Sequence, residues 1–65
     1  MLYRLNLEVF RIAMLEKGYV NKDLLDKTEL SSLTLTRITK GQGTRAKTAN
    51  KLADALGLPV TELFS

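Results

Sequence analysis

The sequence predicts an all-α fold, a compact bundle of about five short helices. Apolar residues recur at intervals of three and four along most of the chain, which is the spacing of one helix face. Four glycines and a single proline separate these segments as stops and turns. Only residues 31–40 also fit a strand, and a lone strand would leave its backbone donors and acceptors unpaired. A helical bundle is therefore expected throughout.

Length and composition restrict the class of protein. The 65 residues correspond to one small domain, residues 1–65, that must place most of its apolar side chains in a single core. The chain has no cysteine and no histidine, which removes disulfides, thiolate zinc sites and histidine-based catalysis. No segment has the ~20 apolar residues of a membrane span, and none resembles a signal peptide. We expect a cytoplasmic protein that is not an enzyme and has no cofactor, metal, membrane partner or small-molecule substrate.

The first two helices are expected at residues 5–17 and 21–28. Helical spacing in the first is carried by Leu5, Val9, Ile12, Ala13 and Glu16. Gly18 is a typical residue for the end of that helix. Asn21 is expected to cap the second helix, because its side chain can accept a bond from a free backbone N–H. The core-facing residues of the second helix are expected to be Leu24 and Leu25.

The third helix is expected at residues 31–40, with the sequence SSLTLTRITK. Ser31 can cap its start, Lys40 lies in its last turn, and Gly41 follows as a stop. At about 100° per residue, its side chains separate into two arcs. The arc facing the core holds Thr34, Leu35 and Ile38, and the outward arc holds Ser32, Leu33, Thr36 and Arg37.

The outward arc of this helix combines small hydroxyl side chains with one leucine and one arginine. The arginine fork matches guanine O6 and N7, and an exposed leucine can contact a thymine methyl group. Such a face fits a DNA major groove better than one covered by long acidic side chains. On composition alone, a solvated surface with one exposed leucine explains the same residues more simply.

The last two helices are expected at residues 47–56 and 61–64. In the first of them, core-facing positions are Thr48 or Ala49, Leu52, Ala53 and Leu56. Gly57 and Pro59 end that helix. The final turn is expected to be capped by Thr61 or frayed.

Charge is unevenly distributed along the chain, although the net charge is only +3. Residues 30–53 carry five basic and no acidic residues, whereas the rest carries five basic and seven acidic residues. The first region is therefore +5 and the remainder −2. This asymmetry predicts an anionic partner for one face, and a merely solvated cationic surface is the alternative.

The segment from Gly18 to Gly41, GYVNKDLLDKTELSSLTLTRITKG, resembles the helix-turn-helix of the lambda-repressor/Cro-like (Xre) family. The following GTRAKTANKLADALGLPVTELF resembles the fourth and fifth helices of that family. The similarity covers the chain from about Leu5 to Phe64. It implies two helices joined by a tight turn, of which the second, residues 31–40, lies in the DNA major groove.

The resemblance implies a role for each matching residue. Base-reading positions are matched by Ser32, Leu33, Thr36 and Arg37. Phosphate-contacting positions are matched by Asn21, Ser31, Lys40, Gln42, Thr44, Arg45 and Lys47. Lys51 is more distant and is expected only to add attractive charge.

The sequence departs from the family pattern around the turn. Leu25 replaces a small alanine, Thr28 replaces an apolar residue, and Glu29 replaces the turn glycine. Glu29 must therefore adopt a left-handed conformation, at a cost of about 1 kcal/mol, or the turn must differ. These neighbours predict a shifted angle between the two helices. Met14 and Thr39 together replace an arginine–glutamate pair, which can be nearly neutral because neither charge is left unpaired.

The function implied by the resemblance is sequence-specific binding of double-stranded DNA by a small Cro/repressor-type regulator of bacteria, phages or mobile elements. It predicts a homodimer on a palindromic or pseudo-palindromic operator, in the bacterial cytoplasm or nucleoid. Dimer contacts are expected at Val60 and Phe64, beside Leu58 and Leu63, unless these apolar residues complete the core instead. Two alternatives remain: a protein-interaction module of the same fold, antitoxin-like or a bridging factor, and the N-terminal domain of a longer repressor.

Overall fold

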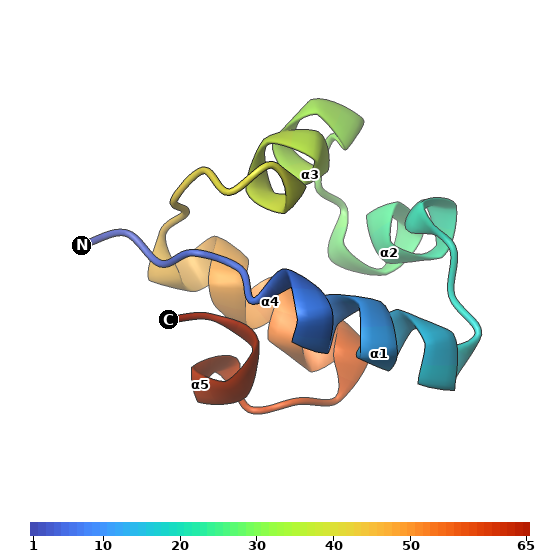
Figure 1. Cartoon of the computed structure of the whole chain (residues 1–65). Coiled ribbons are helices and arrows are strands. Elements are labelled where there is room, and N and C mark those ends of the chain that lie inside the picture. The colour runs from blue at the N-terminus through green and yellow to red at the C-terminus, as the bar shows by residue number, and fades with distance from the viewer.

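A computed structural model describes all 65 residues and contains five helices and no strand, which confirms the predicted all-α fold (Figure 1). The helices are α1 (Leu7–Lys17), α2 (Asn21–Thr28), α3 (Ser32–Thr39), α4 (Ala46–Leu56) and α5 (Val60–Leu63). Helix α4 is central and packs against α1, α2 and α5. Helix α3 lies at one edge of the bundle, and both chain termini lie on the same side of the molecule (Figure 1).

The core is built around one face of α4. Ala49, Leu52, Ala53 and Leu56 are all buried, at the spacing that the sequence predicted. Helix α4 ends at Gly57 and α1 ends at Gly18, as predicted. Both glycines are left-handed, with φ 68° for Gly57 and 69° for Gly18. The complete core also contains Phe10, Ala13, Met14, Leu24, Leu35, Ile38, Leu63 and Phe64. Together these residues form one continuous cluster.

Helix α1 begins later and faces the core differently than predicted. It starts at Leu7 with Asn6 as its cap, whose side chain accepts a bond from the Val9 N–H at 3.2 Å. The buried side chains are Phe10, Ala13 and Met14, whereas Ile12 is 51% exposed and Glu16 is also exposed. Apolar residues occupy more than one face of this helix, so spacing alone did not determine which face would pack inward.

The start of α2 also corrects a prediction. Asn21 is the first helical residue, and Val20 occupies the capping position. The Val20 side chain cannot accept a hydrogen bond, but the Asp23 carboxylate accepts the Val20 N–H at 2.8 Å. Asn21 is therefore not the cap, because it is already part of the helix, and its exposed side chain has no capping role. Of the two leucines predicted to face inward, Leu24 is buried and Leu25 half-buried.

The turn between α2 and α3 accommodates its unusual residues locally. Glu29 adopts a left-handed conformation, φ 60° and ψ 20°, and its N–H donates to the Leu25 carbonyl at 2.9 Å. Thr28 is buried, but its hydroxyl donates to the Leu24 carbonyl at 2.7 Å and accepts from the Leu30 N–H at 3.4 Å. The buried threonine is thus satisfied by the turn itself, and the turn keeps a left-handed residue although no glycine is present.

Replacing Glu29 with glycine should raise the free energy of unfolding by about 1 kcal/mol. Glycine avoids ~1–2 kcal/mol of left-handed strain and loses ~0.5–1 kcal/mol more backbone entropy on folding. For a domain of this size, the change corresponds to a rise in Tm of about 4–8 °C. Thermal unfolding followed by circular dichroism measures it. Glu16→Gly, on the exposed side of α1, is the matched control and should lower stability by about 1 kcal/mol. A lower Tm for Glu29→Gly would mean that its left-handed conformation is not strained.

Short backbone pairings join the N-terminal segment to two distant parts of the chain. Tyr3 pairs antiparallel with Thr44, and Leu5 pairs antiparallel with Phe64. The second pairing explains why α1 begins after Leu5, and it holds the chain that follows α5. Helix α5 begins at Val60 after Pro59, one residue earlier than predicted, so Thr61 is not its cap. No helix of the structure is both long enough and apolar enough to cross a membrane.

Candidate nucleic-acid interface

Helix α3 presents two chemically different faces. Leu35 and Ile38 are each 3% exposed and pack into the core, as predicted, and Thr34 is half-buried. The four residues of the predicted outward arc are all exposed: Ser32, Leu33, Thr36 and Arg37. Leu33 is 57% exposed, although it is apolar. The helix therefore offers solvent a continuous face of two hydroxyls, one leucine and one arginine.

Hydrogen bonds hold both ends of α3. The Ser31 hydroxyl accepts from the Thr34 N–H at 3.1 Å and donates to the Thr34 hydroxyl at 2.9 Å, which confirms its capping role. At the other end, the Lys40 N–H donates to Thr36, and the N–H of Gly41, at φ 96°, donates to Ile38. Because the Ser31 hydrogen already has an acceptor, a phosphate would have to compete with Thr34 for it.

The loop after α3, residues 41–45, is held mainly through its backbone. The Gln42 N–H donates to the Arg37 carbonyl at 3.1 Å. Because this bond uses only the backbone, the exposed Gln42 side chain is free for another partner. Thr44 donates its N–H to the Tyr3 carbonyl at 2.8 Å and accepts the Tyr3 N–H at 2.7 Å. Since both backbone groups of Thr44 are used, only its hydroxyl remains for a phosphate.

The first turn of α4 has an electrostatic character that suits an anion. Its cap position, Arg45, makes no side-chain capping bond, and no acidic residue lies in the first turn. The first backbone N–H groups of a helix lack partners within the helix, and they carry the positive end of its dipole. Arg45 and Lys47 are exposed beside these groups. Together they combine free donors with positive charge, which is a favourable environment for a phosphate.

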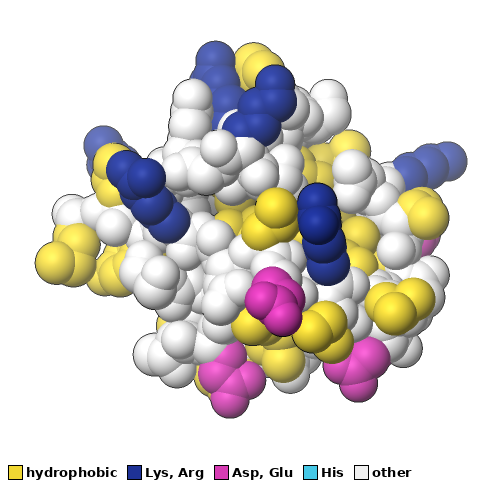
Figure 2. All heavy atoms as spheres, in the orientation of Figure 1, with side chains coloured by type: hydrophobic (Ala, Val, Ile, Leu, Met, Phe, Trp, Pro, Cys, Tyr) yellow, Lys and Arg dark blue, Asp and Glu magenta, His cyan; other side chains and the backbone are white.

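Charged side chains are segregated on the visible surface (Figure 2). Lys and Arg side chains lie mostly over the half of the molecule that holds α3 and the following loop, and Asp and Glu side chains lie mostly over the opposite half (Figure 2). The segment of residues 30–53 contains no acid, and its five basic residues are all exposed: Arg37, Lys40, Arg45, Lys47 and Lys51. Positive charge gathered on one side attracts a polyanion.

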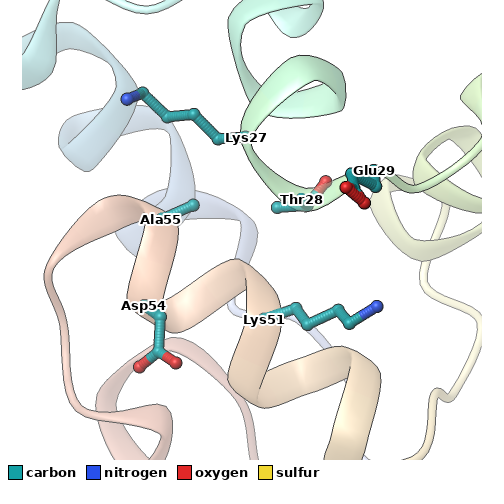
Figure 3. A pocket seen from close by; sticks show the side chains of 6 residues that line it. All are labelled: Lys27, Thr28, Glu29, Lys51, Asp54 and Ala55. Carbon is teal, nitrogen blue, oxygen red and sulfur yellow. The ribbon is translucent and has the colours of Figure 1, made fainter.

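A polar cleft of about 540 Å³ lies between α2, the residue that follows it and α4, and none of the predicted base-reading or phosphate-contacting residues lines it. Its lining residues are Lys27, Thr28, Glu29, Lys51, Asp54 and Ala55. Lys27 and Lys51 extend in opposite directions, and the Asp54 carboxylate turns away from both (Figure 3). The charged groups therefore do not converge on one ligand. The structure also brings together no group of three or more Asp, Glu, His or Cys side chains that could hold a metal ion.

The structure places the other predicted site residues as follows. Lys40 is exposed at the end of α3, and Asn21 is exposed at the start of α2. Phe64, a predicted dimer contact, is only 3% exposed because it completes the core, so little of its side chain is available to a second copy. Val60 is half-buried and lines an apolar groove of about 420 Å³ with Tyr3 and Phe64. A dimer contact at Val60 stays a prediction.

A core-anchored helix that follows another across a tight turn and exposes one largely polar face is the arrangement found in a helix-turn-helix protein. A family model of the Cro/C1-type HTH DNA-binding domain matches residues 10–65. The chain belongs to this family of DNA-binding domains, which confirms the resemblance found in the sequence. Domains of this family are typically not enzymes. The comparisons with curated proteins and with solved structures found no match.

Sequence reasoning missed the N-terminal segment. Residues 1–9 lie outside the family match, and no motif marks them. The structure nevertheless pairs Tyr3 with Thr44, next to the predicted phosphate-contacting residues Gln42 and Arg45. Leu2, Tyr3, Arg4 and Leu5 show no strict alternation of apolar and polar residues, so nothing in the sequence signalled a short extended segment or its partner.

Proposed function

We propose that this protein is a small Cro/repressor-type transcriptional regulator that binds double-stranded DNA sequence-specifically. The observation that supports it best is the exposed face of α3, which is anchored by Leu35 and Ile38 and followed by a basic loop without acidic residues. A helix of this kind fits the major groove, where donors, acceptors and methyl groups distinguish all four base pairs. Occupancy of an operator would then block or redirect polymerase.

The proposed contacts fall into two classes with different consequences. Side chains on the exposed face of α3 read base edges: Ser32, Leu33, Thr36 and Arg37. Side chains around that face contact phosphates: Asn21, Ser31, Lys40, Gln42, Thr44, Arg45 and Lys47. Phosphate contacts set the register and most of the affinity, whereas base contacts provide discrimination. The hydroxyls and the single arginine suit base reading because they are short or planar enough to approach base edges.

The proposed functional unit is a homodimer on a palindromic or pseudo-palindromic operator, with recognition helices about 34 Å apart. One module of this size covers only about 600–1,000 Å², so two copies are needed for useful affinity. Residues 1–65 would act either as the whole regulator or as the DNA-binding domain of a longer repressor, in the bacterial cytoplasm or nucleoid. Sedimentation at micromolar concentration tests the stand-alone form, and a strict monomer that also bound DNA as a monomer would contradict it.

Selection of bound sites from a random duplex pool, followed by a salt titration on the selected site, tests the function directly. Three basic phosphate contacts per copy, Lys40, Arg45 and Lys47, predict a slope of log K against log salt concentration near −3 per copy, or about −5 for a dimer. A selected half-site repeated as a palindrome would support the dimer. Failure to bind any duplex at low salt would contradict DNA binding and would favour a protein partner for the exposed Leu33 instead.

A further inference from the structure

The N-terminal segment runs between two parts of the chain that are remote in sequence. On one side, Tyr3 and Thr44 exchange both backbone hydrogen bonds, at 2.7 and 2.8 Å. On the other side, Arg4 and Ser65 exchange both of theirs at 2.9 Å, and the Asn6 N–H donates to the Leu63 carbonyl at 2.7 Å. The segment thus joins the loop after α3 to the end of the chain, which packs on the core through Leu63. Figure 1 shows it running beside that loop on the side of the molecule where both termini lie.

A close contact accompanies this pairing. A Cβ atom placed on Gly43 would lie 2.8 Å from the Cβ of Leu2, a distance that real side chains essentially never show. Gly43 is not among the residues with positive φ, so contact with Leu2, and not backbone conformation, requires glycine here. The nearest Leu2 atom is bonded directly to its Cα, so a side-chain rotation cannot relieve the clash. A larger residue at 43 must therefore push the two backbones apart.

The loop has few other attachments. The Gly41 and Gln42 N–H groups bond to the end of α3, and no side-chain hydrogen bond forms within residues 41–45. The Tyr3–Thr44 pairing is therefore the main link between the middle of the loop and the rest of the molecule. It lies directly between Gln42 and Arg45, which we propose as phosphate contacts.

We propose that residues 3–5 form a positioning element that holds the phosphate-contacting loop in register with α3. This inference rests on the proposed function. The paired backbone sets the path from Gln42 to Arg45, and thereby the distance between the phosphates that the loop contacts and the bases that α3 reads. Residues 3–5 lie outside the part of the chain that matches the family model, so the match assigns them no role. They need not touch DNA themselves to act in this way.

Three variants of the whole chain test this role: Gly43→Ala, Leu2→Gly and the double variant. Gly43→Ala should displace the loop and remove about one phosphate contact per copy. The magnitude of the salt slope should then fall by about 1 per copy, and the affinity at 0.1 M salt should fall about tenfold per copy. Leu2→Gly removes the clashing atom but keeps the backbone pairing, so it should bind like the unmodified protein. The double variant should regain most of the affinity and slope, because alanine then has room.

Amide hydrogen exchange reports the structural step without DNA. The Thr44 N–H should exchange faster in Gly43→Ala, return toward its original rate in the double variant, and leave the Leu52 amide in the core unchanged. Normal affinity and slope for Gly43→Ala, or weak binding that Leu2→Gly does not rescue, would overturn the positioning role alone. Absence of DNA binding by the unmodified protein would overturn the proposed function, and this role with it.

Discussion

Leu52→Ala should lower the free energy of unfolding by about 2–5 kcal/mol, the range for truncating a buried leucine. Leu52 is 0% exposed and lies in the middle of α4, the helix that packs against three others. The surrounding side chains belong to several helices, so they cannot all move inward to fill the space that the lost methyl groups leave. A domain of 65 residues has a total stability of only about 3–10 kcal/mol. The substitution should therefore remove a large share of it.

Urea unfolding measures this loss as a lower midpoint with an unchanged m-value. Lys51→Ala is the matched control, because it changes the adjacent residue of the same helix on its exposed side. That variant should differ from the original by no more than about 0.5 kcal/mol, since surface substitutions seldom change more. A loss below about 1 kcal/mol for Leu52→Ala would mean that the core collapses around the missing side chain and is less rigidly packed than the structure indicates.

The parts of the fold that the sequence predicted best are those specified by local chemistry. Helix α4 has a single apolar face and a glycine at its end, so its buried residues followed directly from their spacing. Helix α3 has a serine that can cap it and a glycine after its last turn, and the capping bond forms as expected. The exposed arc of α3 follows from the same periodicity once Leu35 and Ile38 are placed in the core.

The errors arose where distant parts of the chain decide the outcome. Ile12 and Met14 are both apolar, and only the packing of α1 on α4 and α5 selects Met14 for the core. The sequence around Phe64 fits a surface position and a core position equally well. The backbone pairing with Leu5, which the sequence does not show, decides between them. The Tyr3–Thr44 pairing joins residues more than forty positions apart. No periodicity within either segment encodes such a contact.

The turn between α2 and α3 has the place that the family resemblance implies but carries residues that the family does not usually have there. The resemblance located the turn correctly, but Thr28 and Glu29 do not match its usual residues. The structure retains the left-handed residue and satisfies the threonine hydroxyl through the Leu24 carbonyl. A threonine can return a hydrogen bond to the carbonyl four residues earlier, so a buried threonine at the end of a helix need not cost an unsatisfied group. The departures are therefore compatible with a helix-turn-helix.

Arg37→Ala should weaken binding to the selected operator by about 1–3 kcal/mol, or about 5- to 150-fold, and relax discrimination at one base position. Arg37 is exposed on the outward arc of α3, where its planar fork can reach guanine O6 and N7 together. Outside its helix, Arg37 forms a hydrogen bond through its backbone carbonyl, which accepts the Gln42 N–H, and alanine keeps that bond. Alanine also favours helix, so the fold should be unaffected.

Comparison of four variants on matched and mismatched duplexes separates base reading from charge. Arg37→Lys should keep the salt slope but lose discrimination, because an ammonium cannot replace the bidentate fork. Lys47→Ala should weaken binding to all sequences alike and reduce the magnitude of the slope by about one unit per copy. Lys17→Ala removes the same charge beside Gly57, at the opposite end of α4, and should leave specific binding nearly unchanged. If Arg37→Ala weakened every duplex equally, as expected for Lys47→Ala, Arg37 would be a phosphate contact, and the bases would be read by the remaining exposed residues of α3.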